Sequence, residues 1–144
     1  MKIKYSLIIT FLVLAILLSG CSGITTPATD EAKIKGVINE YALAINDQNW
    51  SKAKSYCVYG SDVYYATYVF EDGVNTLYQA GFTNVTILIA ITVSNVTVNG
   101  NYASAYVSGN VLIGGAAYYN YYSETESISK YYYLQKVGNN WKLY

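Results

Sequence analysis

The sequence predicts an α+β fold in which N-terminal helices pack on a curved antiparallel β-sheet. Apolar residues recur at helical spacing between residues 30 and 59, whereas β-branched and aromatic residues dominate after Gly81. Two turns rich in Gly and Asn divide this second region, as hairpins between antiparallel strands require. Helices followed by a run of strands are the element order of this fold class.

The first twenty residues have the pattern of a lipoprotein export signal. Two lysines precede the apolar run from Leu7 to Leu18, which at twelve residues is too short to cross a bilayer. Leu18-Ser19-Gly20-Cys21 resembles the lipobox of prokaryotic lipoproteins, whose cysteine takes a diacylglycerol. We therefore expect lipidation of Cys21 and an extracytoplasmic domain anchored to the cell membrane of a prokaryote. A plain secretory signal is the alternative.

The remaining chain divides into a tether and one domain. Residues 21–30 are rich in Ser, Gly, Thr and Ala and contain the one proline, Pro27, so they are expected to form a short flexible tether after the lipidated cysteine. Residues 31–144 have the length of a single domain with one core.

The composition excludes several chemistries. The chain contains no His and no Arg, which removes His-based acid–base catalysis, His-ligated zinc and bidentate Arg recognition of anions. Lipidation of Cys21 leaves Cys57 without a disulfide partner in its own chain. Outside the signal the chain has seven lysines and nine acidic residues, so no basic surface for nucleic acid is expected. We assign no catalytic residue, metal site or cofactor.

Two helices are expected first. Ile34, Ile38 and Ile45 share one face of a helix predicted over Asp30–Asn46. Trp50 and Cys57 recur at helical spacing, which predicts a second helix from Trp50 to Tyr59 with both side chains toward the core. The pattern of residues 61–82 is mixed. Val63 to Phe70 is strand-like, whereas Val74 to Ala80 favours a helix.

The strands follow. They are expected at Val85–Val93, Asn95–Val98, Tyr102–Ile113, Ala117–Tyr122, Ser127–Val137 and Trp141–Tyr144. Asn99-Gly100 predicts a type I′ hairpin turn, and Gly138-Asn139-Asn140 predicts a second hairpin. The run from Thr86 to Val93 carries no charge, so we expect it in the middle of the sheet. From Tyr102 to Ser108 the small and apolar side chains alternate with Tyr and Ser, which predicts one packed face and one wetter face.

The order of these elements resembles the NTF2-like superfamily, a cone-shaped α+β fold also described as cystatin-like, and small prokaryotic lipoproteins of unknown function built on it. Three stretches carry the likeness: residues 38–56, 96–105 and 134–143. The resemblance implies a fold that hosts isomerases, dehydratases, transport factors and ligand-binding domains. Its enzymes commonly use an Asp–His or Tyr–Asp arrangement. The first is excluded here, and no family catalytic residue matches a position of this chain.

Tyrosine supplies 18 of the 144 residues, which is the most unusual feature of the composition. One interpretation is a concave aromatic surface for a ligand, and the candidate ligand-binding residues are Tyr41, Trp50, Tyr64 and Tyr68. The other interpretation, which we favour, is that tyrosine serves as a strand residue on a wet sheet face.

The polar candidates have ordinary alternatives. Asp62, Glu71 and Asp72 could pair with a tyrosine in acid–base chemistry, but solvated loop carboxylates are favoured. Glu124 and Glu126 are interpreted as solvated charges, and Cys57 as a buried small apolar residue. Asn49, Asn84 and Asn95 each begin an N-glycosylation pattern, whose use depends on the host.

Three functional hypotheses follow. The first is a membrane-anchored lipoprotein with a non-catalytic NTF2-like domain that binds a small molecule or a protein partner, with a homodimer through the open sheet face as a further expectation. The second is an enzyme that uses Asp or Glu with Tyr inside the cone. The third is a structural or adhesive surface protein.

Overall fold

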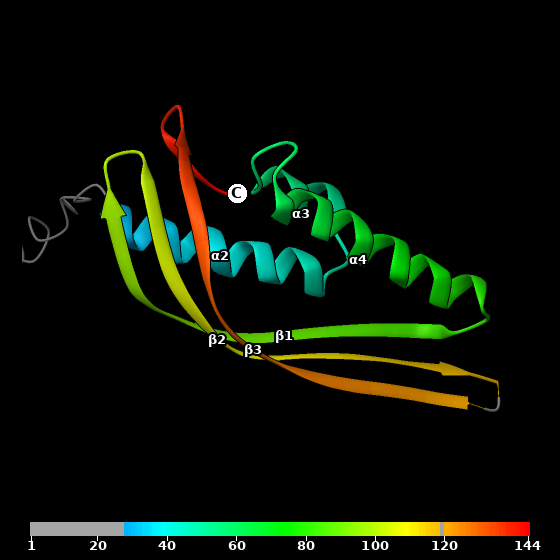
Figure 1. The fold of residues 1–144 in the computed structure, drawn as a ribbon. Helices are drawn as coiled ribbons and strands as arrows, with labels where there is room; N and C mark the ends of the chain where they lie inside the picture. Colours follow the sequence, from blue (N-terminus) through cyan, green and yellow to red (C-terminus); the bar gives the residue numbers. More distant parts are fainter. Residues whose placement is uncertain (1–27, 119) are drawn as a thin grey trace, which may run out of the picture.

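The computed structural model describes residues 28–118 and 120–144. The predicted signal, Cys21 and most of the tether therefore lie outside the described residues. Three helices are followed by a four-stranded antiparallel sheet over the described ranges, as Figure 1 shows. The elements are α2 (Asp30–Asn46), α3 (Trp50–Ser55), α4 (Asp62–Gln79), β1 (Thr83–Asn99), β2 (Tyr102–Ala117), β3 (Asn120–Val137) and β4 (Asn140–Leu143). The predicted fold class is confirmed.

The first helix has the predicted bounds, and the second is shorter than predicted. Thr29 caps α2 by accepting a 3.2 Å hydrogen bond from the amide of Ala32. The predicted helix to Tyr59 is wrong beyond Ser55, because the chain there bonds to β4 instead. Leu143 donates its amide to the Tyr56 carbonyl at 2.9 Å and accepts from the amide of Val58. These backbone bonds replace the last helical turn.

Residues 62–79 form one continuous helix, so the predicted strand from Val63 to Phe70 is wrong. Ser61 caps the helix by accepting a 3.2 Å bond from the amide of Tyr64. Thr67 and Val74, two turns apart, are buried on the same face. The tyrosines and valines that favoured a strand follow a helical period, and burial of that face outweighs their β-propensity.

The sheet runs in chain order, β1-β2-β3-β4. Both predicted hairpins are present, but Gly100 is the one residue of its two-residue turn with positive φ, +60°, which fits type II′ and not I′. The strands predicted over Val85–Val93 and Asn95–Val98 are both part of β1, and the gap predicted between them is a register irregularity between Ser94 and Thr97. The strand predicted over Ala117–Tyr122 is wrong, because β2 ends at Ala117 and β3 begins at Asn120.

Within the described residues β1 pairs with β2 alone, so the prediction that Thr86 to Val93 lies mid-sheet is wrong. Its free edge is covered by two side chains at and just after the end of α2. The Asn46 amide bonds both backbone groups of Ile89, at 2.6 and 3.2 Å, and Gln48 donates to the Val85 carbonyl at 2.6 Å. An edge bonded in this way does not offer those groups to another chain.

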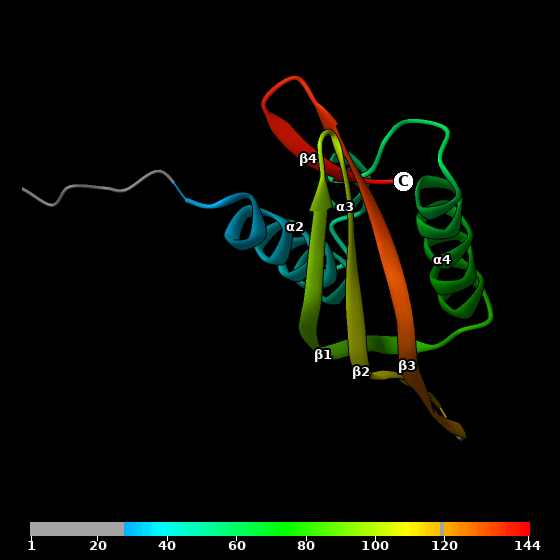
Figure 2. The ribbon, with the colours of Figure 1, turned by 60° about the vertical axis from the view of Figure 1, so that its left-hand side comes forward.

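The core lies between α2 and the inner, concave face of the sheet, as Figures 1 and 2 show together. Alternation along β2 is as predicted, with Ala103, Ala105 and Val107 buried. Cys57 is buried, as predicted, whereas Trp50 is only partly buried. One cluster of buried residues lies at the end of the sheet that carries β4, and a second packs α2, α3 and α4 on the first half of β1. The first contains Ile34, Ile38, Leu134, Trp141 and Leu143, and the second Ala44, Ile45, Ala53, Val74 and Val85.

Candidate functional site

An open cavity of about 400 Å³ lies between α2, α4 and the inner face of the sheet. We call it the inner cavity. Apolar and aromatic side chains from all three make most of its wall. They are Tyr41, Ile45, Ala66, Phe70, Ile89, Val111, Ile128 and Tyr132. This is the kind of lining that binds small molecules in proteins.

Tyr41 lies in the wall of the inner cavity with its hydroxyl group already bonded. Thr67 donates to the Val63 carbonyl at 2.7 Å, so its oxygen accepts the hydrogen bond from the Tyr41 hydroxyl at 2.9 Å. Burial raises the pKa of Tyr41 above its ordinary value of 10.0, against the opposing effect of the bond with Thr67. Tyr41 is therefore a neutral side chain of fixed orientation in the cavity wall, and its hydrogen bond links α2 to α4.

Charge reaches the inner cavity from β3. Glu126, Ile128, Lys130 and Tyr132 alternate along that strand, so they share its inner face. The Lys130 ammonium lies 4.9 Å from the centre of the Tyr132 ring. Glu126 is exposed. The cavity thus joins an apolar wall to one cation and one anion, about 13 Å apart along the strand.

A second open hollow, of about 480 Å³, continues along α4 and is almost wholly apolar. We call it the helix hollow. It shares Ala66 and Phe70 with the inner cavity, so the two spaces adjoin. The other lining residues are Val69, Gly73, Val74, Leu77, Ile113 and Tyr122. Val69 is 73% exposed, an unusual position for a valine that lines a depression.

The inner face of the sheet near β4 is filled by side chains. A void of only about 30 Å³ remains beyond Tyr41, lined in part by Ile38, Ile91 and Val107. Cys57 lies in the same core, and burial raises the pKa of its thiol from 9.0 to about 11. The larger spaces on the inner face therefore lie beside α4.

The structure separates the four candidate ligand-binding residues. Tyr41 lines the inner cavity, whereas Trp50 packs on Phe70 with ring centres 6.3 Å apart, behind the cavity wall. Tyr64 contacts two other tyrosine rings, and Tyr68 is exposed beneath the Lys54 ammonium at 4.5 Å. The lining residues Phe70, Ile128 and Lys130 were not predicted. The alternation of β3 could have indicated the last two, but Phe70 required the helix to be recognised.

The three carboxylates considered for acid–base chemistry lie elsewhere. Asp62 and Asp72 are exposed on α4, and Glu71 forms a 2.7 Å ion pair with Lys54. Glu124 accepts a hydrogen bond from the Tyr122 hydroxyl, which raises the pKa of Tyr122. Among the described lining residues of the inner cavity, the carboxylate is that of Glu126.

Several tyrosines occupy the outer face of the sheet, which is turned away from α2. We call the group the tyrosine face, and it consists of Tyr102, Tyr106, Tyr131, Tyr133 and Tyr144. Four of these are about half exposed, and Tyr106 bonds the Ser129 hydroxyl at 2.6 Å. Most of these rings therefore stand apart from the inner cavity.

Comparison with solved structures identifies the architecture. A candidate dehydratase of the NTF2-like family from Streptomyces avermitilis matches with a TM-score of 0.59 and 16% identity, over 81% of this chain and 93% of that one. An NTF2-like protein with a cystatin-like fold from Novosphingobium aromaticivorans matches with a TM-score of 0.53 and 12% identity, over 79% and 77% of the two chains. The chain has the NTF2-like fold. At these identities the likeness concerns architecture alone.

The remaining comparisons give one further structural match and no match by sequence. The intermembrane space region of the chloroplast protein ARC6 matches with a TM-score of 0.55 and 14% identity, over 81% of this chain and 94% of that one. No protein-family profile and no curated protein matches the sequence. In the described part of the chain, no helix is long and apolar enough to cross a membrane, and no group of three or more Cys, Asp or Glu is placed to hold a metal.

Proposed function

We propose that this chain is an extracytoplasmic lipoprotein, anchored through Cys21, whose NTF2-like domain binds a small amphipathic molecule in the inner cavity and the helix hollow. The observation that carries the proposal is the joining of two open apolar spaces along α4. Lys130 and Glu126 lie in the wall of the inner cavity, and the described lining residues of the helix hollow carry no charge. An apolar body would lie beside Phe70 and Val69, and a polar end would lie near Lys130 or Glu126. Burial of apolar area supplies most of the affinity.

The occupied Tyr41 hydroxyl favours binding over chemistry. A tyrosine that donates to a developing oxyanion needs a free O–H, whereas this one is committed to Thr67. The enzyme alternative would require Glu126 to act as an acid or base at an exposed position, where desolvation is weak. The wall is better suited to holding an apolar group than to moving a proton.

The binding site is tested with the fluorescent probe 1-anilinonaphthalene-8-sulfonate. Ala66 lines both spaces, so Ala66→Trp should fill their junction and weaken probe binding by about tenfold, which is about 1.4 kcal/mol. Asn75→Trp places the same ring on an exposed position of α4 and is the matched control. Equal probe affinity in wild type and the Ala66 variant would contradict the proposed site.

Competition then identifies the polar end of the ligand. Decanoate, decanol and decylamine carry the same apolar chain and differ in charge, so all three should displace the probe. Preference for decanoate that is lost in Lys130→Gln would assign the polar end to Lys130. Preference for decylamine that is lost in Glu126→Gln would assign it to Glu126.

The anchor is tested separately. Cys21→Ser should move the protein from the membrane fraction to the soluble fraction of the host, and mass spectrometry of the wild-type protein should find a diacylglycerol thioether at Cys21. A signal peptide cleaved elsewhere, with Cys21 unmodified, would contradict lipid anchoring and leave the ligand-binding proposal standing.

The tyrosine face favours a second candidate, a protein partner or a second copy bound on the outer sheet. Half-exposed tyrosines offer rigid area at low entropic cost, and interfaces are enriched in them. Analytical ultracentrifugation tests the homodimer. Replacing Tyr131 and Tyr133 with Ser should yield a monomer if the tyrosine face is the interface, and should leave the sedimentation unchanged otherwise.

A further inference from the structure

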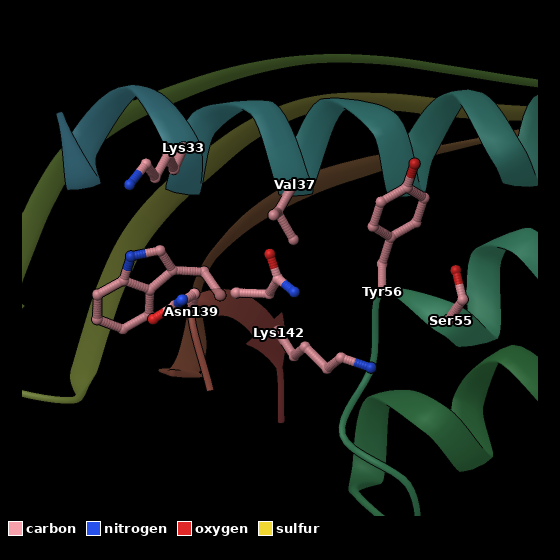
Figure 3. A pocket seen from close by; sticks show the side chains of 8 residues that line it. Lys33, Val37, Ser55, Tyr56, Asn139 and Lys142 are labelled. Atoms are coloured by element: carbon pink, nitrogen blue, oxygen red, sulfur yellow. The ribbon is translucent and has the colours of Figure 1, made fainter. Parts of the chain in front are cut away.

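A separate pocket of about 320 Å³ lies on the side of α2 that faces β4. We call it the lysine pocket. Figure 3 shows Lys33 and Val37 reaching into it from α2, Lys142 and Asn139 from the β3–β4 hairpin, and Tyr56 from the segment after α3. The lining residues not labelled there are Asn140 and Trp141.

The two ammonium groups of this pocket are poorly neutralised. Among the described residues, no carboxylate oxygen lies within 4 Å of the Lys142 ammonium. Lys33 reaches only an oxygen of Asp30, at 3.9 Å. In Figure 3 the ammonium of Lys142 points toward Tyr56, whereas that of Lys33 lies near the start of α2, so the two cations stand at opposite ends of the pocket.

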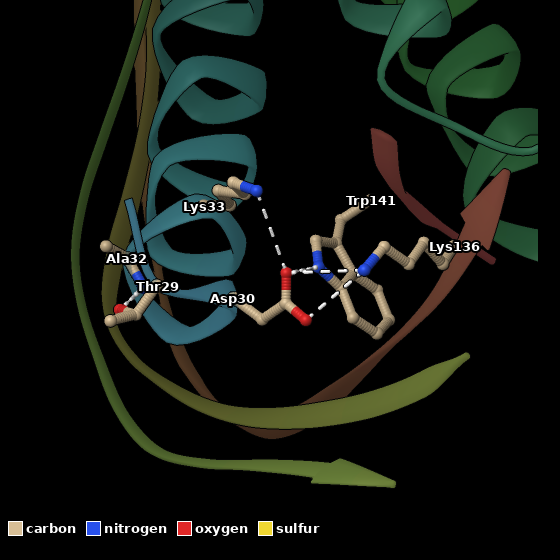
Figure 4. Close-up of polar contacts among 6 residues, drawn as sticks. All are labelled: Thr29, Asp30, Ala32, Lys33, Lys136 and Trp141. Carbon is tan, nitrogen blue, oxygen red and sulfur yellow. Dashed lines mark hydrogen bonds and ion pairs between the residues drawn. The ribbon is translucent and has the colours of Figure 1, made fainter. Parts of the chain in front are cut away.

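Two carboxylates neighbour the pocket. Glu40 accepts hydrogen bonds from the Lys52 ammonium at 3.1 Å and the Tyr56 hydroxyl at 3.3 Å. The other is Asp30, which further groups already engage. Figure 4 shows its carboxylate between the Trp141 indole and the Lys136 ammonium, with Lys33 farther away. The Trp141 Nε1 donates at 3.1 Å and the Lys136 ammonium at 3.3 Å. These bonds lower the pKa of Asp30, with the Trp141 bond the largest cause, but its one charge is shared by three donors. The pocket keeps an excess of positive charge.

Charge is also divided between the two ends of the domain. The end that holds the lysine pocket carries five lysines against three carboxylates: Lys33, Lys35, Lys52, Lys136 and Lys142 against Asp30, Glu31 and Glu40. The end formed by the close of α2, the second half of α4 and the β2–β3 hairpin carries Asp47, Glu71, Asp72, Glu124 and Glu126, and the lysine on the neighbouring part of β3 is Lys130. The domain as a whole is acidic, so this basic end is not a result of composition.

The basic end is the one that the tether joins. Lys33 lies four residues after the cap Thr29, about 6 Å along the helix. The nine residues from Ser22 to Asp30 span at most about 30 Å when extended. A lipid on Cys21 therefore keeps the lysine pocket within reach of the membrane surface.

We infer that the two ends of the lysine pocket bind phosphates of anionic phospholipid headgroups in the membrane that holds the chain. Lys33 and Lys142 supply the charge, and the side-chain amides of Asn139 and Asn140 supply neutral donors. Binding turns the basic end toward the bilayer and the inner cavity away from it. The inference rests on the proposed lipid anchor at Cys21.

The experiment uses the mature lipidated protein in vesicles and the fluorescence of Trp141, which lines the pocket. Trp50→Phe leaves Trp141 as the one tryptophan. Headgroup spin-labelled lipid quenches the indole when the pocket meets the bilayer. Quenching should be stronger in phosphatidylcholine with phosphatidylglycerol than in phosphatidylcholine alone, and Lys33→Gln with Lys142→Gln should abolish the difference.

The control is Lys35→Gln, which removes the same charge from α2 outside the pocket, where Lys35 pairs with Glu31 at 2.8 Å. Full retention of the lipid preference in this variant supports a pocket, whereas an equal loss indicates only general surface attraction and overturns the inference. An equal change of Trp141 emission when inorganic phosphate is added to phosphatidylcholine vesicles also overturns it, since the site would then take the free ion. A flotation assay separates this inference from the proposed anchor. Protein that floats with the vesicles but shows no lipid preference refutes the inference alone. Protein that does not float with the vesicles refutes the anchor as well.

Discussion

The side-chain amide of Asn46 bonds both backbone groups of Ile89, accepting from its N–H at 2.6 Å and donating to its carbonyl at 3.2 Å. The end of α2 thereby acts as a partner strand for the free edge of β1. The contact spans 43 residues of sequence and needs an acceptor and a donor on one short side chain. Asparagine is suited to both roles at once.

Asn46→Asp should destabilise the fold by about 2 kcal/mol at pH 7, because a carboxylate oxygen would replace the donor that faces the Ile89 carbonyl. Protonation restores a donor, so the loss should shrink as the pH falls toward 4. Urea unfolding at both pH values measures this. Asn75→Asp, at an exposed site of α4, should change stability by less than about 0.5 kcal/mol. A loss at Asn46 that does not depend on pH would contradict the pairing.

Asp30 should make stability depend on pH. Its pKa is lowered from 3.8 in the folded chain, first by the Trp141 hydrogen bond. A carboxyl group with a lowered folded pKa stabilises above its unfolded pKa, and this contribution is lost as the pH falls through the folded value. Asp30→Asn should therefore lower the thermal midpoint at pH 7. The difference from wild type should shrink as the pH falls below 3.8 and vanish only below the folded pKa. Glu31→Gln, which breaks only an exposed ion pair, should change little. A difference that persists in acid would refute the role of the charge.

Gly109 should tolerate no side chain. Its φ is +154°, and a Cβ there would lie 2.1 Å from the Ala90 carbonyl oxygen of the paired strand. Gly109→Ala should cost more than about 2 kcal/mol, because backbone must move. Gly36→Ala should instead stabilise by up to about 1 kcal/mol, since Gly36 lies inside α2 and a Cβ there has open space. Equal unfolding midpoints for the two variants would contradict the strand pairing at Gly109.

The Cys57 thiol should be inert in the folded protein. It is buried and its pKa is raised to about 11, so thiolate is scarce at neutral pH. With Cys21→Ser, Cys57 is the one remaining cysteine, and Ellman's reagent at pH 8 should react with it only after urea is added. Rapid reaction without denaturant would place the thiol at the surface.

Local patterns in the sequence were sufficient for much of this architecture. The isoleucine spacing of α2, the hairpin turns and the alternation from Tyr102 to Ser108 are decided by neighbours within a few residues, and all are found in the structure. The prediction of a strand from Val63 to Phe70 was wrong because the local composition favours a strand. The observed helix depends instead on contacts with α2, such as the hydrogen bond between Tyr41 and Thr67.

Long-range pairing explains the other errors. The uncharged run of β1 predicted a central strand, but Asn46 and Gln48, the polar residues that bond to its edge, lie 43 and 37 residues away. The candidate site was predicted in part for the same reason. Tyr41 was predicted from the tyrosine-rich composition and from its place in the first helix. Phe70, Ile128 and Lys130 line the same cavity only because α4 and β3 pack beside that helix.

α4 forms one wall of the inner cavity and of the helix hollow, and it packs mainly on α3 and β1. The position of α4, and with it the width of the two spaces, therefore depends on residues outside their walls. Examples are Trp50, which packs on Phe70, and Ala53, which is buried in the cluster that contains Val74 of α4. Changes of side-chain volume in this hidden layer alter which molecules are admitted while every contact surface stays the same. Under the proposed binding function, sequences with identical cavity walls therefore need not select the same compound.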